Sequence, residues 1–380
     1  MPVILFTTLL ALSALYLPQP LLPVLGQEFG ISPETAALLT TISFLPLSLA
    51  PLLYGMILET FSVKRLLRSA VLLLALFEIL VFWCDSFACL MTLRLCQGMV
   101  IPAMLTALMT YSSRIAPQGE VAKVMAWYVS ATIAGGFAGR FLSGLIASVL
   151  SWQYSFLLLG ASLILAWFWL GRLPDSGQVQ LQKPNGRLVR EVLRSRTMRI
   201  SFGMVFCFFF VFAAMMNYLP FRLTELSPKA NEFRIGAAYI GYLFGIVMSL
   251  NAVRLQDRFG GARNVMVGAL VVFGLALLLM MLPSVAILIA GMFLLCGANF
   301  LTHSSAAGYL NQQAEGRQAV VNGLYVSFYY SGGAAGSYLP GYLYRAFGWN
   351  GYMLALLLVI LLALAFAARL PSPSNERKAC

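Results

Sequence analysis

One stretch of this sequence occurs twice, and the repeat constrains the fold more than any other feature. Residues 128–144 read YVSATIAGGFAGRFLSG and residues 325–341 read YVSFYYSGGAAGSYLPG, so nine of 17 positions match without a gap. The same offset of 197 residues carries Trp152 onto Trp349. Because this offset is about half of the 380 residues, the repeat predicts a chain made of two related halves.

The composition decides what kind of halves these are. Hydrophobic residues make up 60% of the chain and charged residues only 10%, whereas a soluble domain carries about 25% charged residues. A helix needs about 20 apolar residues to cross the hydrocarbon core of a membrane. The apolar runs predict twelve spans, at 3–23, 35–57, 66–84, 87–110, 121–147, 152–171, 199–221, 235–256, 263–282, 284–311, 317–341 and 348–369.

Six spans in each half give both halves the same orientation in the membrane. The predicted fold is therefore all-α, with two six-helix parallel repeats related by an axis along the membrane normal. We expect an N-terminal bundle over 1–171, a cytoplasmic linker over 172–198, a C-terminal bundle over 199–370 and a cytoplasmic tail over 371–380. The first span begins almost at the first residue without a basic segment before it, which favours a retained helix over a signal peptide.

The net charge of +12 indicates topology and not nucleic-acid binding. If the N-terminus is cytoplasmic, the cytoplasmic segments hold 19 Lys and Arg residues and the opposite loops hold four. This bias follows the positive-inside rule and predicts that both termini are cytoplasmic. The lipid bilayer is thus the expected partner of the apolar surface.

Glycines in the fifth span of each half have matching positions. Small residues three to five positions apart allow helix backbones to approach closely. This predicts a pair of close-packed helices at corresponding places, with a role in packing or in the movement of the two halves. The residues concerned are Gly135, Gly136 and Gly139 in the first half, and Gly332, Gly333 and Gly336 in the second.

Two loops combine an acidic residue with basic residues at a predicted cytoplasmic helix end. This pattern is typical of a charge latch between adjacent helices and predicts gating loops. The first loop carries Gly55, Glu59, Lys64 and Arg65, and the second carries Asp257, Arg258 and Arg263.

Further motifs give the chain a family resemblance. The first span ends YLPQPLLPVLGQEFG, and RLCQG, with Arg94 and Gln97, lies near the start of the fourth span. With the loops and the glycine-rich fifth spans, this order of motifs resembles the major facilitator superfamily, and most closely its twelve-span drug/proton antiporter branch. The resemblance implies a bacterial inner-membrane transporter that exports a small, amphipathic or drug-like substrate in exchange for protons.

The chain departs from that branch in several places. Glu59 stands where the family usually has Asp, and Ser62 and Val253 stand where it usually has Gly. The fifth span also lacks the Gly-Pro pair of the antiporter motif. These departures weaken the inference of antiport more than the inference of transport.

Three ionisable residues lie inside predicted spans of the first half. Charged groups in a membrane cost free energy and are usually functional. Glu78, Arg94 and Arg140 each lie six or seven residues from the outer end of their span, which places them at a similar depth of about 10 Å. We expect Glu78 to exchange a proton beside one of the two arginines. The alternatives are a static structural pair and a Glu78 side chain that points to the outer headgroups.

Polar and aromatic residues near mid-membrane are candidates for lining a substrate cavity, although each could instead serve helix packing. Asn299 and His303 share one face of the tenth span, since they are four residues apart. The full set of candidates is Gln19, Gln97, Asn217, Asn299, His303, Tyr325 and Tyr329.

The sequence lacks the signatures of an enzyme or of ATP-driven transport. It contains no phosphate-binding loop, and its single histidine and scattered cysteines give no metal constellation. We therefore expect no cofactor, and we expect the cysteines to be small buried hydrophobes. Cys84 and Cys89, which flank a short outer turn, form a minor alternative as a disulfide.

The sequence therefore predicts a monomeric secondary transporter that works by alternating access. A sugar or metabolite symporter or uniporter stays open as an alternative. A receptor or lipid-handling protein on the same scaffold stays open as another. The residues fix neither the substrate nor the direction of transport.

Overall fold

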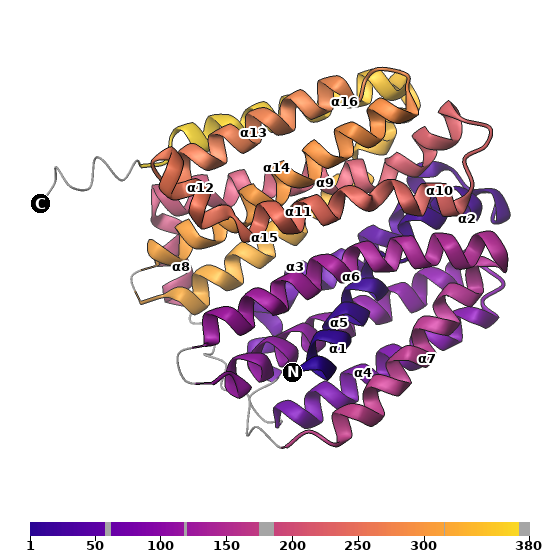
Figure 1. Cartoon of the computed structure of the whole chain (residues 1–380), viewed down its shortest axis with the longest axis horizontal. Coiled ribbons are helices and arrows are strands. Elements are labelled where there is room, and N and C mark those ends of the chain that lie inside the picture. Colours follow the sequence, from indigo (N-terminus) through magenta and orange to yellow (C-terminus); the bar gives the residue numbers. More distant parts are fainter. Residues whose placement is uncertain (58–61, 118–119, 175–185, 315, 372–380) are drawn as a thin grey trace, which may run out of the picture. The chain divides into compact units, whose positions relative to one another are not determined.

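The computed structural model describes residues 1–57, 62–117, 120–174, 186–314 and 316–371 (Figure 1). Within these residues the chain forms helices and no β-strand. The helices of the first half are α1 (Pro2–Tyr16), η1 (Gln19–Leu21), α2 (Leu22–Glu28), α3 (Pro33–Ile57), α4 (Val63–Leu80), η3 (Val81–Trp83), α5 (Phe87–Ile115), α6 (Val121–Val149) and α7 (Trp152–Gly171).

The remaining helices follow after residue 185. They are α8 (Gly186–Arg194), α9 (Arg196–Leu226), α10 (Glu232–Ala237), η4 (Ala238–Ile240), α11 (Gly241–Leu250), α12 (Ala252–Phe259), α13 (Ala262–Leu279), α14 (Val285–Gln312), α15 (Gln318–Tyr338) and α16 (Pro340–Ala368). The prediction of an all-helical membrane fold is thus confirmed.

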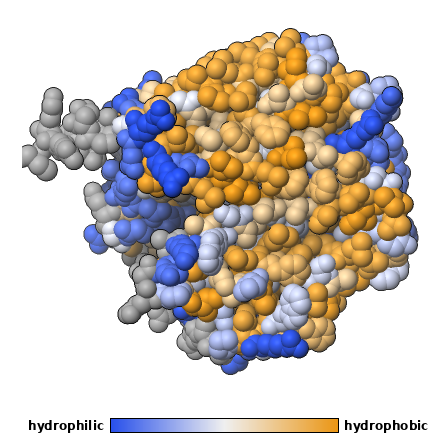
Figure 2. Space-filling model, in the orientation of Figure 1, coloured by the Kyte–Doolittle hydropathy of each residue, from blue (hydrophilic) through white to orange (hydrophobic). Residues whose placement is uncertain are grey.

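Ten helical segments of the described residues are long and apolar enough to cross a membrane. The other two predicted spans correspond to α3, with 25 residues, and to α15, with 21 residues. α15 is less apolar because Gly, Ser and Tyr are frequent in it. Exposed apolar side chains cover much of the helical surface visible in Figure 2, as expected for a protein in contact with lipid.

Several predicted spans are interrupted where the sequence breaks the helix. The first span is not one helix over 3–23, because Pro18 and Pro20 have no backbone N–H and α1 ends at Tyr16. The predicted span 235–256 is divided into the end of α10, η4, α11 and most of α12. α16 begins before residue 348 and contains a kink at Gly348, whose φ of 65° is left-handed.

The described helices cluster into two compact units. The first unit comprises Met1–Lys183 and Asn217–Tyr239, and the second comprises Pro184–Met216 and Ile240–Cys380. The chain thus passes from one unit to the other inside α9, between Met216 and Asn217. Pro220 lies one turn later in this helix and cannot donate to the carbonyl of Met216.

The glycines of the repeated stretch bring their helices close to a neighbour in each unit. In the first unit, a Cβ on Gly135 or Gly139 would lie 2.4 Å from Leu9 O or 2.6 Å from Ser13 O of α1. Ser13 also donates from its hydroxyl to Gly135 O at 3.0 Å. Only glycine permits this approach of α6 to α1.

The second unit repeats the same contact between α15 and α9. A Cβ on Gly332 would lie 2.3 Å from Phe206 O, and one on Gly336 would lie 2.0 Å from Phe210 O. Phe206 and Phe210 follow Leu9 and Ser13 by the same 197 residues that separate the glycines. The repeat therefore preserves the helix contact as well as the sequence.

Candidate functional site

The Arg94 side chain is fully buried and binds the broken end of α1. Its Nη1 donates to Ala14 O at 2.9 Å and its Nη2 to Leu15 O at 3.0 Å. Pro18 is the residue whose N–H would have bound Ala14 O in a continuous helix. The arginine thus occupies carbonyls at a helix C-terminus, where a positive charge is favoured.

Two further contacts complete the environment of Arg94. Its Nε donates to Leu39 O of α3 at 3.3 Å, and its Nη1 donates to Gln97 Oε1 at 2.7 Å. Gln97 is fully buried, and its Nε2 makes no hydrogen bond. The predicted cavity residue Gln97 therefore lies beside Arg94, one turn along α5.

Glu78 of α4 is fully buried, and neither of its carboxylate oxygens has a hydrogen-bond partner. Arg94 is the charged residue that acts on it electrostatically. The guanidinium of Arg94, however, is already bound to three backbone carbonyls and Gln97. The structure thus places Glu78 within electrostatic range of Arg94 and gives the two no direct hydrogen bond.

Arg140 does not join that pair and belongs to a second polar cluster. Its Nε donates to Gln19 Oε1 at 2.7 Å, and its Nη1 donates to Gly136 O at 2.5 Å. Its guanidinium carbon lies 4.2 Å from the ring centroid of Tyr16 and 5.0 Å from that of Tyr239. Aromatic faces at this distance favour a cation.

The same cluster includes two predicted cavity residues. Gln19 Nε2 donates to Asn217 Oδ1 at 2.7 Å, and Asn217 Nδ2 donates to Ala37 O at 3.4 Å. Both side chains are fully buried. A continuous chain of hydrogen bonds therefore links Arg140 of α6 through η1 and α9 to α3, all within the first unit.

In the second unit, a different cluster contains His303, Tyr325 and Tyr329. The hydroxyl of Tyr325 lies 2.5 Å from His303 Nδ1, and the rings of His303 and Tyr329 are 4.9 Å apart. Tyr329 stacks on Phe209 of α9 with centroids 3.5 Å apart. One turn before His303, Asn299 is fully buried, and neither atom of its amide has a partner.

Two of the basic residues of the predicted gating loops, Lys64 and Arg263, bind helix ends within their own unit. Lys64 Nζ donates to Gly171 O at 2.9 Å and also to Leu173 O, at the end of α7. Arg263 Nη2 donates to Ala368 O, the last residue of α16, at 2.6 Å. Both cations thus complement a helix C-terminus.

The other loop residues make fewer contacts. Arg65, Asp257 and Arg258 are exposed, and Arg258 lies 6.0 Å from the ring of Phe259. Gly55 lies in α3, and Glu59 lies outside the described residues. The predicted charge latch around Glu59 therefore also falls outside them.

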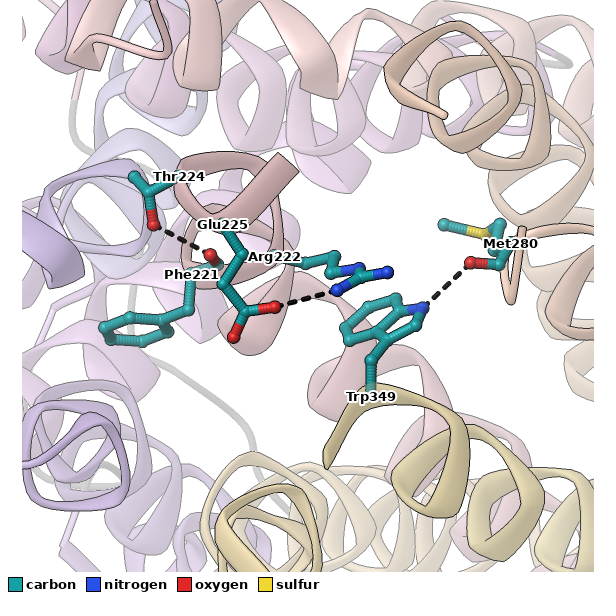
Figure 3. Close-up of polar contacts among 6 residues, drawn as sticks. All are labelled: Phe221, Arg222, Thr224, Glu225, Met280 and Trp349. Atoms are coloured by element: carbon teal, nitrogen blue, oxygen red, sulfur yellow. Dashed lines mark hydrogen bonds and ion pairs between the residues drawn. The ribbon is translucent and has the colours of Figure 1, made fainter. Parts of the chain in front are cut away.

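Sequence reasoning gave no role to the two repeat-related tryptophans beyond their matching positions. Trp152 Nε1 donates to Glu28 Oε2 at 2.5 Å, and Trp349 Nε1 donates to Met280 O at 2.8 Å (Figure 3). Figure 3 also shows the Arg222–Glu225 ion pair of α9, at 2.9 Å. The indoles occupy matching sequence positions but have different acceptors, so their partners could not be transferred from one half to the other.

A disulfide joins Cys84 and Cys89 between η3 and α5. The disulfide, stated as the minor alternative, is thus confirmed, and their spacing around a turn was the available signal. Cys84 is buried as predicted, whereas the prediction of burial is wrong for Cys89, which is exposed. Among the described residues, no group of three His, Cys, Asp or Glu could hold a metal ion.

These features define a multi-pass helical membrane protein with two internally related halves. The family model for the Major Facilitator Superfamily matches residues 4–229 and 226–379. The chain therefore belongs to the major facilitator superfamily, as its motifs indicated.

Related proteins support membrane transport as the activity. The chain is 28% identical over 365 residues to the inner membrane transport protein YnfM of Escherichia coli (strain K12), covering 94% of this chain and 86% of the relative. It is 25% identical over 374 residues to an uncharacterized MFS-type transporter, YybF of Bacillus subtilis (strain 168), covering 96% and 92%.

Among solved structures, a bacterial homologue of the human lysosomal transporter Spinster, inward-facing and unoccupied, matches with a TM-score of 0.75. The two chains are 14% identical, and the match covers 96% of this chain and 94% of the other. The likeness shows the fold. Family membership and the related transporters identify the chain as a membrane transporter.

Proposed function

We propose that this transporter exports a small amphipathic molecule from the cytoplasm in exchange for protons, with Glu78 as the proton-binding residue. The observation that carries the proposal is the Glu78 carboxyl group, which is fully buried with both oxygens unpartnered. A charged carboxylate without hydrogen bonds is costly inside a membrane protein. Binding a proton removes that charge, and releasing the proton restores the attraction to Arg94.

The position of Arg94 supports this role. Its hydrogen bonds to Ala14, Leu15 and Leu39 fix the guanidinium to two other helices, so it is not free to close on Glu78. The arginine supplies a fixed positive charge near the acid, and it does so without a direct hydrogen bond. Such an arrangement lets the acid gain and lose its proton without the loss of a salt bridge.

The direction of transport and the location rest on the resemblance and on charge bias. The drug/proton antiporter branch exports its substrates, and the excess of Lys and Arg predicts cytoplasmic termini in an inner membrane. Within this proposal the transporter acts as a monomer.

Proteoliposomes containing a pH-sensitive dye test the proposal. The substrate is first identified as a compound whose accumulation in cells changes when the gene is deleted. In the parent protein, addition of this compound should move protons across the membrane. Glu78→Gln should abolish this proton movement and uphill transport, while exchange of labelled for unlabelled compound continues.

The matched control is Glu120→Gln, since Glu120 is an exposed acid paired with Lys123 at 3.4 Å. This variant should couple protons as the parent does. Unchanged proton coupling in Glu78→Gln would exclude Glu78 as the proton site. Substrate flux without any proton movement in the parent would instead indicate a uniporter, and binding without flux would indicate a receptor.

A further inference from the structure

Asn299 is a buried polar residue without a partner in the second unit. Its side chain is fully buried in α14, and neither Nδ2 nor Oδ1 forms a hydrogen bond. The hydroxyl of Thr302, also fully buried, has no partner either. Buried polar atoms in native proteins nearly always have a partner, so these atoms are suited to hydrogen-bond a ligand group or water.

Aromatic rings lie on the same side of α14 as this amide. His303 is four residues after Asn299 and therefore lies on the same helical face. Its ring is 4.9 Å from that of Tyr329, which in turn stacks on Phe209. Rings from α9, α14 and α15 thus form one aromatic cluster on the helical face of α14 that carries the unpaired amide, and aromatic rings favour stacking with other planar apolar groups.

The charge distribution restricts what this cluster can bind. The segments that surround it contain no Asp, Glu, Lys or Arg, namely 200–216, 241–250, 285–312 and 318–338. A charged ligand group would therefore find no counter-ion in these segments of the second unit. Burying such a group unpaired is costly, which favours an uncharged ligand.

We propose that Asn299 is the hydrogen-bonding point of a site for an uncharged aromatic molecule that carries both a donor and an acceptor, such as a secondary aryl amide. The amide of Asn299 pairs with that donor and acceptor, and the stacked pair of Tyr329 and Phe209 contacts the aromatic part. The inference names the substrate class of the transporter and so rests on the proposed function. It does not depend on Glu78.

Two probes of matched shape separate hydrogen bonding from apolar contact. Benzanilide contains two phenyl rings joined by an amide, and trans-stilbene joins the same rings by a carbon–carbon double bond. Binding of each radiolabelled probe is measured on the full chain in nanodiscs, with empty nanodiscs to subtract partition into lipid. The parent should bind benzanilide about tenfold more tightly than trans-stilbene, which corresponds to a difference of about 1.4 kcal/mol in binding free energy.

Asn299→Leu should remove this tenfold preference while it retains the binding of trans-stilbene. The matched control is Asn311→Leu on the same helix, because Asn311 Nδ2 already donates to Ala307 O of its own helix at 3.0 Å. This control should keep the preference. Tyr329→Leu should weaken both probes to a similar degree, since it removes the stacking surface.

Several outcomes would overturn the inference. Equal affinity of the parent for the two probes would show that water alone satisfies Asn299, and this comparison needs no variant to fold. The absence of benzanilide binding would also contradict the inference. So would a preference for benzanilide that survives Asn299→Leu. Glu78→Gln should keep the benzanilide preference, so a failure of proton coupling and a failure of this site give different results.

Discussion

The contacts of Arg94 predict that Arg94→Met is strongly destabilising. The substitution leaves the carbonyls of Ala14 and Leu15 without the donors that hold them, and Pro18 cannot replace the donor to Ala14. Each buried acceptor left unpaired costs about 1–3 kcal/mol. The two together lower the free energy of unfolding by about 2–6 kcal/mol, and loss of the charge near Glu78 adds to this.

Equilibrium unfolding in mixed micelles with increasing dodecyl sulfate, followed by tryptophan fluorescence, measures this effect. Arg94→Lys keeps the charge, but a single ammonium lacks the forked donors that reach two helices, so it should be intermediate. Adding Glu78→Gln to Arg94→Met removes the carboxylate and should recover part of the lost stability.

Two results would refute this reasoning. A change below about 0.5 kcal/mol in Arg94→Met, the range of ordinary surface substitutions, would show that Arg94 does not hold the end of α1. Full stability of Arg94→Lys would show that charge matters and that the geometry of the guanidinium does not.

Two further predictions concern packing and the disulfide. Gly336→Ala places a methyl group 2.0 Å from Phe210 O and should destabilise the protein by at least about 1–3 kcal/mol in the same unfolding assay. The control Gly308→Ala has open space around it and should be neutral or stabilising. Equal effects of the two substitutions would contradict the close approach of α15 to α9. Cys84→Ser should leave the exposed Cys89 reactive toward a maleimide without reductant. In the parent, Cys84 and Cys89 should be labelled only after reduction. Labelling of either cysteine in the untreated parent would argue against the disulfide.

Sequence patterns predicted the helices and the repeat well because both depend on local composition. Runs of apolar residues of about 20 residues fix the helical membrane fold, and glycine spacing indicated where α6 and α15 have a close neighbour. The break after Tyr16 was less visible, because prolines inside membrane helices often only bend them. The consequence of this break, that Arg94 binds the carbonyl of Ala14, could be seen only in the structure.

The candidate site was harder to predict because depth in the membrane does not fix the direction of a side chain. Glu78, Arg94 and Arg140 lie at similar distances from the ends of their predicted spans, yet the structure places only Glu78 and Arg94 within electrostatic range of each other. Arg140 instead contacts Gln19, which pairs with Asn217 across 198 residues of sequence. Rotation of each helix about its axis decides such pairings, and uniformly apolar helices give little periodic signal of that rotation.

The contacts of Lys64 and Arg263 have a consequence for the biogenesis of the protein. Lys64 binds the end of α7, which is made 107 residues later, and Arg263 binds the end of α16, which follows by 105 residues. During synthesis each contact can therefore form only after the last span of the same half has emerged from the ribosome. Each half is thus closed by a contact between its third and sixth spans, and the first half can be closed before the second is complete.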